Sequence, residues 1–140
     1  MKTLKFLFMT AFFLSSTLCM AQGKNNIKVT ITNIESNEGT LQVGLYNNSN
    51  LFLKETYKSL TAKAKEGSIE VIFENVPNGI YAISLYHDQD DNKKLNKLFG
   101  MIPTEPYGIS NNAKEPYSAP LWEKAKFSIK NQNITQKISL

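Results

Sequence analysis

The residues best suited to chemistry form one short acidic turn. Asp88, Asp90 and Asp91 lie within four residues and are followed by Asn92. Carboxylates this close repel one another by up to about 4 kcal/mol per pair at an effective dielectric of ~20. We therefore expect a positive charge beside them, supplied either by a bound Ca²⁺ ion or by lysines of the chain itself.

The calcium hypothesis rests on the spacing of the oxygen-bearing side chains. Asp88, Asp90 and Asn92 stand at alternate positions, which is how a calcium loop begins, and Asn96 and backbone carbonyls could complete the set. Ca²⁺ takes six to eight oxygens at about 2.3–2.6 Å. The glutamate that closes an EF-hand is missing, because Phe99 stands at its position. The sequence thus predicts a structural calcium site of another kind, with Asp88, Asp90, Asn92 and Asn96 as ligands.

The alternative needs no metal. Lys93, Lys94 and Lys97 follow the acidic turn directly, so three cations face three carboxylates. A solvated turn neutralised by these lysines fits the same residues, and both hypotheses remain open.

The chain offers little for catalysis. His87 is its only histidine, and its neighbour Asp88 would point to the opposite side of a strand, which does not suit a catalytic pair. The chain has no second histidine, and it has no serine in the glycine-flanked elbow of a nucleophilic site. We predict a protein that is not an enzyme. The remaining enzymatic alternative is a carboxylate-dependent hydrolase that pairs Asp88 or Asp90 with Glu105 or Glu115 across loops.

A second group of residues could recognise a ligand. Tyr107, Tyr117 and Trp122 lie in a long connection rich in glycine and proline, and Asn111 and Asn112 stand between them. Exposed aromatic rings of this kind can stack on sugars, with the amides as polar contacts. The simpler interpretation is that the rings cover one end of the core, which we favour for Trp122.

Residues 1–21 are typical of a secretory signal peptide. Lys2 and Lys5 precede an apolar run that is too short to span a membrane, and we expect cleavage after Ala21. A lipid anchor on Cys19 is disfavoured by the residues before it. The protein is then expected to be exported to the periplasm or the extracellular space, with no transmembrane segment in the mature chain.

Residues 22–140 have the length of a single domain. They contain no cysteine, so packing must stabilise them without disulfides. The formal charge of +4 falls to +2 without Lys2 and Lys5, and the positive charges are all lysine, since the chain contains no arginine. Arginine is the usual tool for bidentate phosphate and base recognition, so we predict that nucleic acid is not a partner.

The elements that must position these residues are short strands. Turn residues join six such stretches into three pairs, which we expect to be hairpins: 27–32 with 41–46 across 35–39, 69–74 with 80–86 across 76–79, and 125–130 with 134–140 across 131–133. Residues 80–86 are apolar on both faces, as in a central strand. The segment 51–65 is expected to be a crossover with one short strand, and residues 121–124 a single helical turn.

About seven short strands without a helix of ordinary length predict an all-β protein. The economical packing is an antiparallel β-sandwich of the immunoglobulin or prealbumin kind. A small closed barrel is the alternative.

The run that begins at His87 resembles the signature HDxNxNGxLD…FGIPxExYGFSNN of a secreted bacterial domain-of-unknown-function family, family 2141. The matching residues are His87, Asp88, Asp90, Asn92, Lys94 and Leu95, then Phe99, Gly100, Ile102, Pro103, Glu105, Tyr107, Gly108, Ser110, Asn111 and Asn112. Residues 76–82 are similar to the family's LPPGxYA turn and residues 125–127 to its AxF strand. The resemblance implies a small exported β-sandwich of the prealbumin or bacterial surface-repeat type whose biochemistry is unassigned.

Two departures from this signature weaken a metal site. Lys93 stands where the family carries glycine, and Asn96 where it carries aspartate. Glycine permits a turn with positive φ, and aspartate would add an oxygen donor.

Together these features predict an exported, noncatalytic binding or scaffolding module of the envelope or the secreted fraction. The sequence does not identify its partner, for which an envelope protein and a glycan are the candidates, and its acidic loop is the candidate calcium site. The alternative function is a carbohydrate-binding module built on the loop aromatics.

Overall fold

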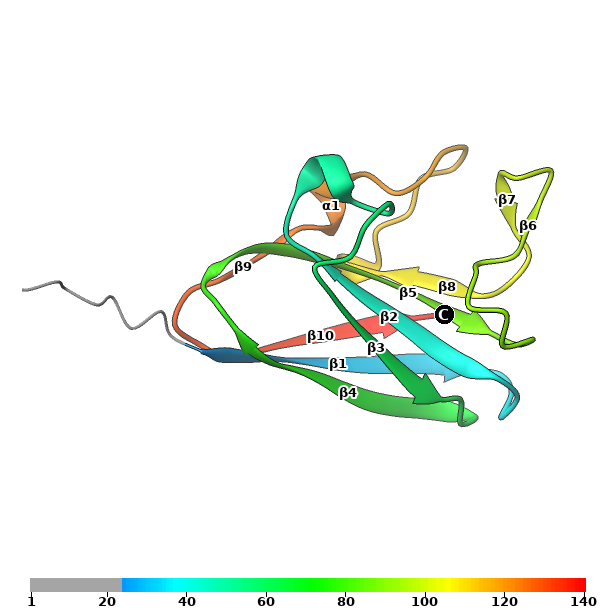
Figure 1. Cartoon of the computed structure of the whole chain (residues 1–140), viewed down its shortest axis with the longest axis horizontal. Helices are drawn as coiled ribbons and strands as arrows, with labels where there is room; N and C mark the ends of the chain where they lie inside the picture. The colour runs from blue at the N-terminus through cyan, green and yellow to red at the C-terminus, as the bar shows by residue number, and fades with distance from the viewer. Residues whose placement is uncertain (1–23) are drawn as a thin grey trace, which may run out of the picture.

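The protein consists of two β-sheets packed face to face, as a computed structural model shows (Figure 1). The structure describes residues 24–140. The signal peptide expected at residues 1–21 lies outside them.

Three strands form the first sheet, in the order β10-β1-β4, and five form the second, in the order β3-β2-β5-β8 with β9 also paired to β5. The strands of the first sheet are β1 (Asn25–Ile34), β4 (Gly67–Val76) and β10 (Ile134–Ser139). Those of the second are β2 (Thr40–Tyr46), β3 (Lys58–Lys63), β5 (Gly79–Asp88), β8 (Tyr107–Ile109) and β9 (Phe127–Ile129). Two further short strands, β6 (Lys97–Leu98) and β7 (Ile102–Pro103), form a separate hairpin.

The main core lies between the two sheets and explains why these residues form strands. Alternate side chains of β1, such as Ile27, Val29 and Ile31, are fully buried, while Lys28 between them is exposed. Leu41 and its alternate neighbours on β2 face them from the other sheet. This period of two buries one face of each strand. The predicted all-β sandwich is confirmed, and neither sheet closes into a barrel.

The three predicted hairpins are wrong. β1 and β2 lie in different sheets, and the same holds for β4 and β5 and for β9 and β10. The short links therefore pass from one layer to the other, and β1 pairs with β4 and β10 instead. An alternating pattern states which face of a strand is buried. It cannot distinguish two strands that pair edge to edge from two that face each other across a core.

One pairing departs from an antiparallel arrangement. β10 runs parallel to β1, with Ile27 opposite Ile134 and Ile31 opposite Ile138. Two parallel strands must be joined by a crossover connection. Between β1 and β10 the chain passes through the other sheet, and it enters β10 from β9.

The outer face of the five-stranded sheet is also covered. A second cluster contains Tyr46, Phe52, Ala82 and Ile109, packed against the one-turn helix α1 (Trp122–Ala125) and the long connections. β5 is thus buried on both faces between β2 and β8, as predicted for a central strand. The predicted short strand within 51–65 corresponds to β3, and the predicted helical turn to α1. No helix in the described part of the chain is long and apolar enough to cross a membrane.

Candidate functional site

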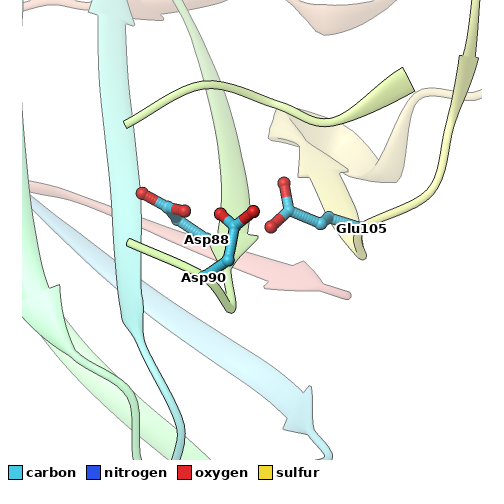
Figure 2. A group of neighbouring side chains, drawn as sticks. All are labelled: Asp88, Asp90 and Glu105. Atoms are coloured by element: carbon cyan, nitrogen blue, oxygen red, sulfur yellow. The ribbon is translucent and has the colours of Figure 1, made fainter. Parts of the chain in front are cut away.

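Three carboxylates converge where β5 ends (Figure 2). Asp88 is the last residue of β5, Asp90 follows in the turn, and Glu105 precedes β8. Each contributes an oxygen, and these oxygens lie within 4.8 Å of one another. Asp88 and Glu105 are buried, with 0% and 6% of their surface exposed, whereas Asp90 faces solvent.

The turn after β5 folds around the Asp88 carboxylate. The backbone N–H groups of Asn92 and Lys93 donate to it at 3.1 and 2.8 Å. Lys93 has φ of 61° and Asp91 has φ of 56°, both in the left-handed region. Lys93 therefore adopts a backbone conformation that glycine enters more easily than other residues. The Asp88 side chain supplies two acceptors for amides that a tight turn would otherwise leave unpaired.

Glu105 joins this turn to the hairpin that follows it. One of its oxygens accepts from the backbone N–H of Gln89 at 3.0 Å, and the other from that of Asn96 at 2.9 Å. Sequence reasoning considered Glu105 for hydrolysis but omitted it from the metal ligands. The available signal was its place inside the same long signature, but proximity to Asp88 depends on how the 16 intervening residues fold back.

Asp90 is held in its ionised form. The side-chain amide of Asn96 donates to it at 2.9 Å, and Asn92 donates through both its backbone and its side chain. These hydrogen bonds, above all the one from Asn96, lower the pKa of Asp90 below its ordinary value of 3.8.

The two predicted asparagine ligands surround the carboxylates. The Asn92 side-chain oxygen accepts from Lys94 N at 2.8 Å, and the Asn96 side-chain oxygen accepts from the Asn92 amide at 2.6 Å. Their amide hydrogens, in turn, point to Asp90. The carboxylate set that the geometry brings together is thus Asp88, Asp90 and Glu105, with both asparagines beside it.

Lysines do not pair directly with this group. Within residues 24–140, the ion pairs are Lys28 with Glu70, Lys124 with Glu115, and Lys126 with Glu123. None involves Lys93, Lys94 or Lys97, and Glu115 is held at Lys124, away from the other three carboxylates. The acidic group is therefore compensated by backbone and amide donors in the described structure.

An all-oxygen set of this kind suits a hard cation. Three carboxylates can offer up to six oxygens, which matches the flexible coordination of Ca²⁺ better than the strict octahedron of Mg²⁺. Histidine and cysteine, which zinc prefers, are not among the ligands.

His87 is fully buried and serves the fold. Its Nε2 lies 2.6 Å from the carbonyl oxygen of Glu38, so Nε2 carries the proton and donates. Its backbone N–H donates to Pro106 O at 2.9 Å. The ring thereby ties β5 to the link between β1 and β2, as a structural histidine would.

The five residues considered for sugar binding have different roles. Asn111 donates to the carbonyl oxygens of Lys124 and Lys126, both at 3.0 Å. Asn112 accepts from Ser139 N at 3.0 Å. Trp122 packs edge to face on Phe52, with ring centroids 5.6 Å apart, and Tyr107 is half-buried on β8. Tyr117 is fully exposed. The sugar-binding surface stays a prediction, for which Tyr117 offers the most accessible ring.

Comparison with known proteins gives one match. A family model described as "Uncharacterized protein conserved in bacteria (DUF2141)" matches residues 29–137, which cover both sheets and the acidic turn. No curated protein and no solved structure matches the chain.

Proposed function

The chain belongs to the uncharacterised bacterial family DUF2141, and from that premise we propose that it is an exported, noncatalytic module for binding or scaffolding in the envelope, whose acidic loop holds a structural Ca²⁺ ion. The observation that carries the proposal is the convergence of Asp88, Asp90 and Glu105 within 4.8 Å.

Electrostatics supports a cation at this place. Two of the three carboxylates are buried, and negative charges this close together repel one another. Four backbone N–H groups donate to Asp88 and Glu105, which leaves further lone pairs on both carboxylates. A divalent ion would neutralise the charge that these neutral donors cannot remove.

The position of the group supports a structural role for the ion. Asp88 ends a central strand, Asp90 lies in the turn, and Glu105 holds the base of the β6-β7 hairpin through Asn96. An ion here would fix the long connection between β5 and β8 to the sandwich. The nearby His87 donates from Nε2 to a backbone carbonyl, and its Nδ1 is buried without a hydrogen-bond partner among the described residues.

The test is thermal unfolding of residues 22–140 in a chelator and in millimolar Ca²⁺, followed by the fluorescence of Trp122, the only tryptophan. A ligand that binds only the native state stabilises it by about 2.7 kcal/mol at a hundred times its Kd, so the midpoint should rise by several degrees.

Two variants and one control locate the effect. Asp90→Asn and Glu105→Gln should each abolish the rise in midpoint. Glu55→Gln, which changes an exposed carboxylate outside the site, should retain it. An unchanged wild-type midpoint in millimolar Ca²⁺ would remove the calcium proposal.

A further inference from the structure

The β6-β7 hairpin carries apolar side chains that belong to neither core. Leu98, Phe99, Met101 and Ile102 are 50%, 82%, 76% and 58% exposed. In Figure 1 this hairpin stands away from both sheets. Single exposed apolar residues are ordinary, but four within five positions on a projecting tip mark an interaction surface. We call these four residues the apolar tip.

The segment that carries the apolar tip has charge of one sign. Residues 93–104 contain Lys93, Lys94 and Lys97, all exposed, and no acidic residue. The nearest acidic residues on either side of this segment are Asp90, Asp91 and Glu105, of which Asp90 and Asp91 are exposed. Each accepts hydrogen bonds from other groups of the fold, and Asp90 accepts from Asn92 and Asn96. Asp91 accepts from the hydroxyl of Thr40 at 2.9 Å, and Glu105 accepts from two backbone N–H groups. The hairpin thus presents apolar residues at its end and cations toward its base.

We infer that the apolar tip inserts into the surface of an anionic lipid bilayer. A bilayer offers hydrocarbon beneath a layer of negative headgroups, so it matches the apolar tip and the lysines behind it in the same order. A second copy of this chain is a less suitable occupant, because two such hairpins would bring their lysines together and repel.

The backbone of the hairpin is suited to this environment. Lys97 pairs with Pro103 and Leu98 with Ile102, and the N–H of Met101 donates to Leu98 O at 3.2 Å. Backbone groups without partners are costly in an apolar phase, so a hairpin that satisfies much of its own backbone can enter the interface more readily than an open loop.

The base of the hairpin is fixed to the sandwich. Thr104 N donates to Asn96 O at 2.9 Å, and Asn96 N donates to the Glu105 carboxylate at 2.9 Å. The tip is therefore held in a projecting position before it meets a surface, which reduces the entropy lost on binding. The inference rests on the exposure and charge of the hairpin, so it is independent of the proposed calcium site.

The experiment measures flotation of residues 22–140 with lipid vesicles in a chelator. This segment contains the whole described sandwich and omits the apolar leader, which could bind lipid by itself. We expect binding to vesicles of phosphatidylethanolamine and phosphatidylglycerol that weakens as salt is raised. The double variant F99S/M101S should lower the partition coefficient by about tenfold or more, because it removes two large apolar side chains from the insertion.

Matched controls separate the hairpin from the rest of the surface. Tyr117→Ser removes an aromatic ring that is even more exposed but lies elsewhere, and this variant should bind as the wild type does. The double variant K94Q/K97Q should weaken binding to the anionic vesicles roughly tenfold, whereas K63Q/K130Q, which removes two exposed lysines elsewhere, should weaken it much less. Trp122 fluorescence during unfolding verifies that each variant is folded.

Three results would overturn the inference. The first is that the wild type does not bind the vesicles, and the second is that F99S/M101S binds them as strongly as the wild type. The third is that the wild type binds no lipid but forms a concentration-dependent dimer, which F99S/M101S abolishes. Because calcium is chelated throughout, none of these results bears on the proposed cation site.

Discussion

Gly39 packs directly against the backbone of Asp88. A β-carbon on Gly39 would lie 2.0 Å from the Asp88 carbonyl oxygen, and Gly39 has φ of +68°. The link between β1 and β2 therefore touches the strand end that carries the first carboxylate of the acidic group. Glu38, the preceding residue, accepts the hydrogen bond from His87. Two successive residues of this link thus fix the end of β5.

Gly39→Ala should lower the free energy of unfolding by roughly 2–4 kcal/mol. About 1 kcal/mol comes from the positive φ, and the remainder from a clash with backbone that cannot move aside easily. The control is Gly100→Ala, since Gly100 has φ of +70° and a β-carbon added to it would meet no atom within 4 Å. It should cost only about 1 kcal/mol in urea unfolding. Equal losses would show that the contact with Asp88 does not matter.

Ser110→Ala should destabilise the protein although only one oxygen is lost. The Ser110 hydroxyl is fully buried, accepts from Ile83 N at 2.9 Å and donates to Ala125 O at 2.6 Å, so it joins β5 to α1. Removal leaves a buried donor and acceptor unpaired, at a cost of about 1–3 kcal/mol. Ser118→Ala, at an exposed site, should change the urea midpoint little. Similar midpoints for the two variants would contradict this role of Ser110.

Ionisation of Tyr46 should lower the stability of the protein at alkaline pH. Burial raises the pKa of Tyr46 above its ordinary value of 10.0. Because the folded pKa exceeds the unfolded one, the stabilisation is fully present below pH 10 and decreases as the pH rises toward the folded pKa. Tyr46→Phe keeps the edge-to-face contact with Phe52, at 5.3 Å between centroids, but cannot ionise. Urea unfolding between pH 8 and about 11 should show a shallower decline for the variant. Parallel declines would assign the effect to other groups.

The sequence predicts strands well in this protein because burial and strand geometry share a period of two. Ile27, Val29 and Ile31 could be assigned to a buried face without knowing which strand lies opposite. Pairing could not be predicted in the same way. The links at 35–39 and 76–79 have turn composition, yet they join different sheets, since a change of layer and a hairpin both need a sharp reversal.

The sequence could predict only those residues of the candidate site that lie close together along the chain. Asp88 and Asp90 stand in one turn, whereas Glu105 reaches them from beyond the β6-β7 hairpin. Asn111 and Asn112 resembled ligand contacts because exposed amides often bind ligands. In the structure they bond to backbone atoms around α1 and β10, which composition cannot indicate.

Lys93 occupies a backbone position better suited to glycine. Its φ of 61° costs an ordinary residue about 1–2 kcal/mol, whereas glycine adopts it freely but loses about 0.5–1 kcal/mol more in chain entropy. Lys93→Gly should therefore stabilise the protein by about 0.5–1 kcal/mol in urea unfolding with chelator present. Lys94→Gly removes the same charge at a neighbouring position without positive φ, and it should destabilise by a similar amount. The idea fails if Lys93→Gly is no more stable than Lys94→Gly, because the turn would then gain nothing from glycine at position 93.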